Sequence, residues 1–183
     1  MSPLFHLLFA LLLLASSALS ACDFPNGTAT ALHWWQCGGQ PDIVFTEAHA
    51  VDEHGKEVYP IHMTSPIFVQ SHMRNIVGVL TAPNLKESIR VFQYTSSWSS
   101  TDCQWSEVPT FGLLKNLDAC SIGVECPVAK GEVDLKVTID FTKFSFIISH
   151  LTNDIPYMIE FTLTDKVSGG TVCISAQARG LTK

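Results

Sequence analysis

The first twenty residues contain no lysine, arginine, aspartate or glutamate. The apolar run Leu7–Ala15 within them has nine residues, whereas a helix that crosses a bilayer needs about 20. Small residues follow this run, and Ala18 and Ser20 occupy the positions that a signal peptidase recognises. The sequence therefore predicts a cleaved secretory signal over residues 1–21, and no later segment has the length and hydropathy of a membrane span.

Residues 19–22, Leu-Ser-Ala-Cys, also fit a bacterial lipoprotein signal in which Cys22 carries the lipid. The chain has six cysteines, and lipidation of Cys22 leaves five, an odd number for a secreted protein. The triplet Asn26–Thr28 is an N-glycosylation acceptor, with the glycan on Asn26, if the protein is eukaryotic. Cysteine parity and the triplet favour a secreted, disulfide-bonded glycoprotein of the extracellular space or the lysosomal lumen.

The chain also lacks the motifs of common enzymes: it has no G-x-S-x-G, no H-E-x-x-H, no phosphate-binding loop and no papain-like cysteine context. Four histidines, His49, His54, His62 and His72, fall within 24 residues, but their spacings of five, eight and ten do not fit the usual metal-ligand pairs. We therefore predict no catalytic residue, no metal site and no cofactor.

Basic residues are few, with 11 against 17 acidic ones, so the formal net charge is −6. This balance disfavours a protein that binds nucleic acid or anionic membranes through long-range attraction. The sequence shows no internal repeat, no run of like charges and no Pro/Ser-rich linker. The roughly 160 residues after the signal are enough for one domain with a real core, and we expect a monomer.

Alternation of apolar and polar residues is the strongest pattern in the chain. In Val133–Phe141 the apolar residues occupy every second position, which is typical of a strand with one buried face. The segment Ile155–Leu163 repeats the pattern, and Asp165–Gly170 forms a tight turn into Thr171–Ala178. Weaker strand candidates rich in β-branched and aromatic residues are 42–51, 66–73, 75–82 and 88–94. About seven or eight strands in one chain predict an all-β fold, an antiparallel, immunoglobulin-like β-sandwich.

The segment Phe141–Pro156 breaks the alternation. The three consecutive apolar residues Phe146–Ile148 exceed what one buried strand face can take. Two interpretations remain open: a strand buried on both sides or a loop folded over an ordinary core, and residues that line or gate a cavity for an apolar ligand. The cavity interpretation assigns the lining to Val137, Ile139, Phe141, Phe144, Phe146, Ile148, Leu151, Ile159 and Phe161.

The segments Cys120–Gly131 (CSIGVECPVAKG) and Gly169–Gly180 (GGTVCISAQARG) together resemble the C-terminal half of the ML lipid-recognition domain. This family includes the Niemann–Pick type C cholesterol-transfer protein and the ganglioside activator proteins. Upstream, Trp35–Gly39 (WQCGG) resembles the region of the first cysteine of the family. The resemblance implies a sandwich with an internal lipid cavity, and it divides the chain into a signal (1–21), an N-terminal lead-in (22–36) and an ML-like domain (37–181).

The resemblance also implies two disulfides, Cys120–Cys126 and Cys37–Cys173, which leaves Cys22 and Cys103 to pair with each other. In the chain-entropy model the seven-residue ring contributes about 2 kcal/mol and the long link about 5 kcal/mol. The sequence departs from the family in an extra segment, Ser96–Gly112, and in the long apolar stretch around Phe146, which is closer to the ganglioside activators than to the sterol carriers.

The predicted function is therefore that of a lipid-binding protein, not an enzyme, which holds one sterol, fatty-acyl lipid or glycolipid between its sheets and transfers or presents it. Transient contact with a membrane or a receptor would accompany this role. Two alternatives stay open: an accessory protein that lifts a glycolipid out for a hydrolase, and an extracellular module with a packed core that binds protein or glycan on its surface. The chain also has four tryptophans, which could stack on a sugar, lie at a membrane interface or be buried for structural reasons. They are Trp34, Trp35, Trp98 and Trp105.

Overall fold

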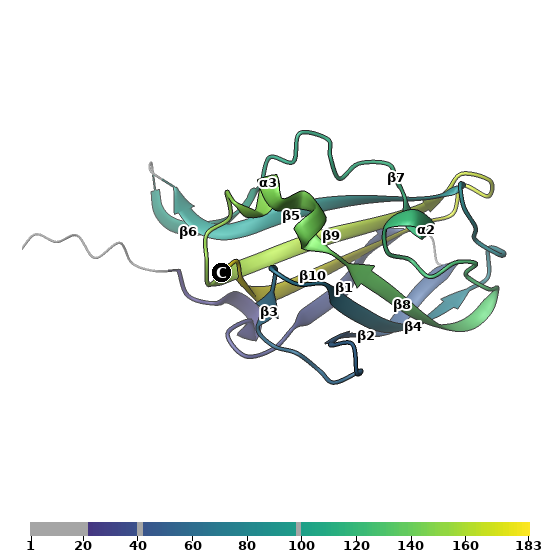
Figure 1. Cartoon of the computed structure of the whole chain (residues 1–183), viewed down its shortest axis with the longest axis horizontal. Coiled ribbons are helices and arrows are strands. Elements are labelled where there is room, and N and C mark those ends of the chain that lie inside the picture. The colour runs from purple at the N-terminus through teal and green to yellow at the C-terminus, as the bar shows by residue number, and fades with distance from the viewer. Residues whose placement is uncertain (1–21, 40–41, 98–99) are drawn as a thin grey trace, which may run out of the picture.

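The computed structural model describes residues 22–39, 42–97 and 100–183 (Figure 1). The predicted signal, residues 1–21, and Trp98 lie outside the described residues. The elements in chain order are η1 (Pro25–Gly27), β1 (His33–Gly39), β2 (Ile43–Val51), β3 (Ile61–His62), β4 (Ile67–Asn75), β5 (Leu85–Ser97), β6 (Ser100–Glu107), β7 (Leu117–Asp118), α2 (Ala119–Ile122), β8 (Gly131–Ile139), η2 (Phe141–Phe144), α3 (Ser145–Ile148), β9 (Ile155–Asp165) and β10 (Thr171–Leu181).

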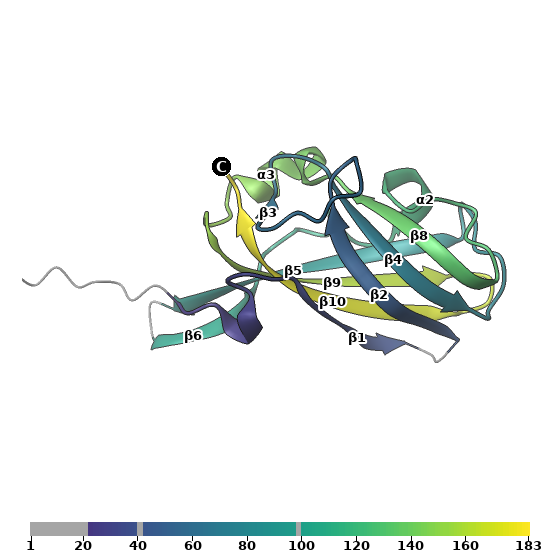
Figure 2. The ribbon, with the colours of Figure 1, turned by 90° about the horizontal axis from the view of Figure 1, so that it is seen from below.

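The strands form two sheets that lie against each other as layers (Figure 2). The larger sheet has the order β1-β10-β9-β5-β6, with the short β3 paired to β10 and the short β7 paired to β5. The smaller sheet has the order β2-β4-β8. All pairs within the described residues are antiparallel except β3 with β10. The predicted all-β antiparallel sandwich is confirmed.

The clearest sequence patterns lie in the strands that they predict. In β8, Leu135 and Val137 are buried between the sheets, whereas Glu132 and Asp134 are exposed on the other face. β9 and β10 form an uninterrupted ladder, from Thr171 opposite Thr164 to Gly180 opposite Ile155. The turn between them comprises residues 166–170. The carboxylate of Asp165, the last residue of β9, holds this turn by accepting hydrogen bonds from the backbone N–H and the hydroxyl of Ser168. The alternation of apolar and polar residues therefore predicts all three strands, although burial itself alternates only in β8, because Ser175 and Gln177 on the polar side of β10 are buried as well.

Two expectations about the elements differ from the structure. Residues 75–82 form no strand after Asn75; Leu80 makes only an isolated bridge with Val128, with backbone N–O distances of 2.9 Å in both directions. The segment 141–148 is not a strand buried on both sides but the short helices η2 and α3, folded over the edge of the sandwich (Figure 1). The strand β1 begins at His33 and pairs with β10, so it crosses the position of Cys37, at which the ML-like domain was expected to begin. The division of the chain into a lead-in and a domain stays a prediction.

A β-bulge decides which side chains of β2 face inward. The pairing of β2 with β4 shifts between Phe45 and Glu47. Ile43 and Phe45 point into the sandwich before the shift, and Ala48 and Ala50 after it. Strict alternation from Phe45 would instead bury Glu47 and the residue two positions further on. Because a bulge adds one residue to a strand, the charged side chain stays in water and the alanines go inside.

Three disulfides link the described cysteines, and they are the pairs expected above: Cys22–Cys103, Cys37–Cys173 and Cys120–Cys126. The sulfur of Cys22 is bonded to that of Cys103, which leaves no thiol there for a lipid anchor. The small ring Cys120–Cys126 lies beside β8, where the N–H of Thr138 donates to the carbonyl of Gly123 at 2.9 Å. This ring therefore fixes the course of the chain along the edge of the smaller sheet.

Candidate functional site

The two ends of the sandwich are filled differently. At the end that carries α2, large buried side chains pack into one cluster. They come from both sheets, as Met73 and Leu85 do, and from the loop between β4 and β5, as Leu80 does. Toward the other end the inward residues of β2 and β10 become small, and a hollow remains between the sheets. Facing sheets stand about 10 Å apart, which alanine side chains are too short to fill. The hollow, called cavity A below, therefore results from residue size along two strands.

Cavity A has a volume of about 120 Å³. Its wall is almost entirely apolar, and Ser71, whose hydroxyl donates to the carbonyl of Leu135, is the only hydroxyl-bearing side chain in it besides the phenol of Tyr157. The phenol donates to the carbonyl of Thr152 at 2.6 Å. The lining residues are Leu32, Trp34, Phe45, Ala48, Ala50, Ile61, Met63, Ile67, Val69, Ser71, Val137, Ile139, Phe141, Tyr157, Ile159, Phe161, Ile174, Ala176, Ala178 and Gly180.

Gly180 lies where β10 passes close to two other side chains in the wall of cavity A. A Cβ atom at this position would lie 2.6 Å from Cε of Met63 and 2.6 Å from Cδ2 of Tyr157. Cε of Met63 is the end of a flexible side chain that borders a hollow, but the buried ring of Tyr157 is rigid and its hydroxyl is fixed on the carbonyl of Thr152. Residue 180 thus has to lack a side chain for β10 to pass this close to the wall of the cavity.

A second hollow, cavity B, of about 50 Å³ lies under η2 and α3. It is lined by Met63, Glu87, Ile89, Val91, Leu114, Ile122, Val137, Thr138, Ile139, Asp140, Phe141, Lys143, Phe144, Ile147, Ile148, Leu151, Ile159 and Phe161. Cavity B differs from cavity A in charge, because the carboxyl of Glu87 and the side chains of Asp140 and Lys143 border it.

A partition of shared side chains separates the two cavities. It consists of the residues that line both: Met63, Val137, Ile139, Phe141, Ile159 and Phe161. Rotation of these side chains, or a small increase in the spacing of the sheets, would join the two hollows. No backbone ladder joins the two sheets in the described residues, so such an increase breaks none. The side-chain amide of Gln36 on β1 does hold β2, since it donates to the carbonyl of Ile43 at 3.1 Å and accepts from the N–H of Phe45 at 3.2 Å, and these two bonds tie the sheets together at that edge.

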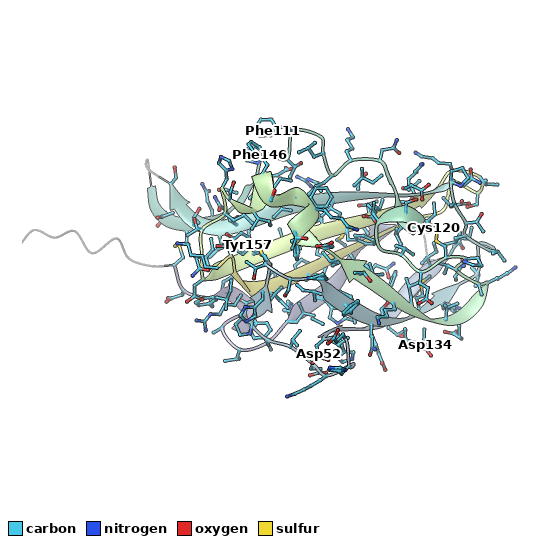
Figure 3. All side chains as sticks on the ribbon, viewed as in Figure 1. Asp52, Phe111, Cys120, Asp134, Phe146 and Tyr157 are labelled. Carbon is cyan, nitrogen blue, oxygen red and sulfur yellow. A yellow bond between two sulfur atoms is a disulfide. The ribbon has the colours of Figure 1, made fainter. Side chains whose placement is uncertain are left out.

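Eight of the nine residues expected in a cavity lining do border a cavity. Five of them lie in the partition, and the other three, Phe144, Ile148 and Leu151, line cavity B alone. The ninth residue, Phe146, borders neither cavity. Its side chain is 56% exposed, and its ring centroid lies 6.2 Å from that of Phe111 and 4.8 Å from that of His150. Figure 3 shows Phe111 and Phe146 together at the outer edge of the molecule. The helical turn of α3 causes the difference, since it directs Ile147 inward and Phe146 outward.

Sequence reasoning missed the wall contributed by β1, β2, β4 and β10. The signal was present in part, because the small inward residues Ala176 and Ala178 follow the larger Val172 and Ile174 on one face of a predicted strand. The alanines of β2 gave no such signal, since the bulge interrupts their alternation. Of the described tryptophans, Trp34 lines cavity A. The ring of Trp35 packs at a tilt against His33, with ring centroids 5.5 Å apart, and the ring of Trp105 packs at a tilt against Tyr94, with ring centroids 5.0 Å apart.

The four histidines of the sequence pattern lie apart from both cavities. His49 faces Glu57, with Nδ1–Oε1 at 2.9 Å, and His54 lies in the turn after β2. His72 contacts Oδ1 of Asp134 at 2.7 Å, and this hydrogen bond raises the pKa of the imidazole. In the described residues no group of three or more histidine, cysteine or acidic side chains is arranged to hold a metal ion. Likewise, no described helix has the length and hydropathy to cross a membrane.

The expected glycosylation acceptor lies in η1. Asn26 is exposed, and its amide nitrogen donates to Oε1 of Gln177 at 2.9 Å. Thr28, the third residue of the triplet, is buried, and its hydroxyl donates to the carbonyl of Pro25 at 2.6 Å. Glycosylation of Asn26 stays a prediction.

Substitution by aspartate distinguishes the two phenylalanines of this segment. Phe144→Asp places a charge in the apolar wall of cavity B and is expected to lower the free energy of unfolding by about 3 kcal/mol. Phe146→Asp changes an exposed ring and is expected to cost less than about 1 kcal/mol. Urea unfolding of both variants checks this, and equal losses would contradict the placement of Phe146 on the surface.

Two solved structures are similar to this chain. A Niemann–Pick type C2 protein from the Japanese carpenter ant is 18% identical in sequence, with a TM-score of 0.46, over 81% of this chain and 98% of its own. Chicken MD-1, solved in complex with lipid IVa, is 15% identical, with a TM-score of 0.37, over 87% of this chain and 94% of its own. No protein-family model and no curated protein matches the chain.

Proposed function

We propose that this chain is a secreted or endolysosomal lipid-binding protein of the ML type, which holds one sterol, fatty-acyl lipid or glycolipid between its sheets and transfers or presents it. The observation that carries the proposal is cavity A, a hollow between two sheets with an almost wholly apolar wall. Well-packed interiors contain few voids larger than a water molecule, because each lost contact costs stability. A ligand that restores these contacts explains why the void persists.

The energetics favour a carrier. Each methylene moved from apolar surroundings into water costs about 0.8 kcal/mol, so a 16-carbon chain faces roughly 12 kcal/mol. A closed apolar cavity offsets most of this cost without any bond being made or broken. The role therefore needs no catalytic residue, and the resemblance of the cysteine segments to the ML family points to the same role.

The ligand has to enlarge the hollow that it enters. A cavity of about 150 Å³ holds one benzene molecule, so cavity A, at about 120 Å³, takes a similar group and not a whole acyl chain or sterol. Joining cavity A to cavity B through the partition lengthens the space in the direction of η2 and α3. We expect lipid binding to move Phe141 and Phe161, because both side chains stand between the hollows.

The test is the lipid content of the purified protein. Native mass spectrometry and organic extraction are expected to show lipid at up to one molecule per chain, and a delipidated sample is expected to take up a fluorescent sterol or acyl lipid from vesicles. A protein that stays lipid-free in both measurements is no carrier, and the surface recognition module then becomes the better account. A coupled assay with a glycolipid hydrolase separates simple transfer from presentation to an enzyme.

A further inference from the structure

The carboxyl of Glu87 lies inside the sandwich, at the wall of cavity B. Glu87 is on β5 and is 4% exposed, and its neighbours across the sheet are Leu163 on β9 and Leu117 on β7. Oxygen Oε2 has no hydrogen-bond partner among the described residues. Buried polar atoms nearly always have a partner, so an unpaired carboxyl oxygen beside an apolar cavity calls for a specific reason.

The charged groups around Glu87 do not supply that partner. Asp140 and Lys143 border cavity B, but they face each other, with Oδ2–Nζ at 3.8 Å. Lys86, next to Glu87 on β5, lies opposite Asp118 on β7. Both are one position out of step with Glu87 and its partner Leu117, and are therefore on the other face of the sheet. Lys115, on the loop before β7, is exposed. Burial, with no compensating positive charge, raises the pKa of the Glu87 carboxyl to about 7.

We propose that Glu87 accepts a hydrogen bond from the hydroxyl group of an uncharged lipid alcohol, whose polar end lies in cavity B and whose hydrocarbon extends through the partition into cavity A. The inference rests on the proposed function and adds the class of lipid and its orientation. The apolar wall of cavity A offers a hydroxyl no partner comparable to this carboxyl. Cavity B provides an acceptor at a distance from solvent, where a hydrogen bond to a charged group is strong.

Two other lipid classes fit this site less well. A fatty acid would place a second carboxyl group beside Glu87, and two carboxylates close together disfavour each other. A long-chain amine would form a buried ion pair, whose desolvation cost offsets much of its attraction. The alcohol donates one hydrogen bond and brings no charge, which is what the single unpaired oxygen requires.

The experiment compares three ligands of equal chain length: hexadecan-1-ol, hexadecanoate and hexadecylamine. Each isotope-labelled ligand is offered from a cyclodextrin complex to the delipidated full-length mature protein, and the bound fraction is measured at pH 5 and pH 8. At pH 8 we expect the wild type to prefer the alcohol to the acid by about 30-fold, the ratio typical of one hydrogen bond to a charged group. At pH 5 the preference is expected to shrink to a few-fold.

The variant Glu87→Gln keeps the shape of the side chain and removes its charge. It is expected to bind the alcohol about tenfold more weakly at pH 8, to bind the acid more tightly, and to show little difference between the two pH values. Glu53→Gln, at an exposed glutamate in the turn after β2, is the matched control and is expected to behave as the wild type. Reversal of the order of two ligands is a readout that a merely structural role of Glu87 would not move.

The outcomes separate the inference from the proposed function. If the ligands bind but Glu87→Gln leaves the preference unchanged, or if the amine binds best at pH 8, the assignment of a lipid alcohol to Glu87 is overturned and the carrier function stands. If none of the three binds to any variant, the carrier function fails and the inference fails with it. Should Glu87→Gln not fold, the preference of the wild type still decides, since an equal ratio at pH 5 and pH 8 contradicts the proposal.

Discussion

The substitution Ala176→Phe is expected to lower lipid affinity by about 100-fold or more while the protein stays folded. Ala176 lines cavity A from β10, opposite Ile159 of β9. Cavity A holds about one aromatic ring, so the new phenyl group occupies the space that the ligand needs. A lipid that loses the burial of about four methylenes, each worth about 0.8 kcal/mol, loses about 3 kcal/mol of binding free energy.

The stability of this variant is the necessary second measurement. Filling an existing void restores packing contacts, whereas overfilling strains the neighbours, so we expect the free energy of unfolding to change by less than about 2 kcal/mol. Ala129→Phe is the control, because residue 129 is exposed and distant from the lining of both cavities. Wild-type binding by a folded Ala176→Phe variant would show that lipid does not enter cavity A.

The substitution Glu87→Gln is expected to stabilise the protein by about 3 kcal/mol at pH 8 and by little at pH 4.5. The folded-state pKa of Glu87, about 7, lies above the value of about 4.5 expected in the unfolded chain. As the pH rises from 4.5 to 7, the unfolded chain releases this proton while the folded protein retains it, so wild-type stability falls by about 1.4 kcal/mol per pH unit. Glutamine has no such proton to release, so the variant does not lose this stability as the pH rises.

Urea unfolding at pH 4.5, 6 and 8 measures the effect as the difference between variant and wild type. His72 also has a raised pKa, which likewise lowers stability as the pH rises, but it is present in both proteins and cancels in the difference. Glu53→Gln is again the control, with a difference expected to stay constant over this range. A constant difference for Glu87→Gln would mean that water or a counter-charge reaches the carboxyl.

The sequence determined the strands in which apolar and polar residues alternate. The alternation in β8, β9 and β10 depends only on which residues prefer water, and the structure places each of these strands where the pattern predicts it. The resemblance of the cysteine segments anticipated two of the disulfides, Cys37–Cys173 and Cys120–Cys126, and the third was the pair left over. Five of the six residues of the partition, all except Met63, were likewise among the residues expected in the lining.

The tertiary structure alone decided where the space is and which residues border it. The bulge in β2 reversed the inward face after Phe45, and a local pattern cannot report an extra residue that only pairing with β4 reveals. Phe146 lies outside the cavity because α3 is a single helical turn, too short for a periodic signal. Glu87 lies inside because β9 and β7 pair with β5 on both sides, and burial in such a place depends on partners far along the chain. Residue preference is local, whereas a cavity is the space that distant segments leave between them.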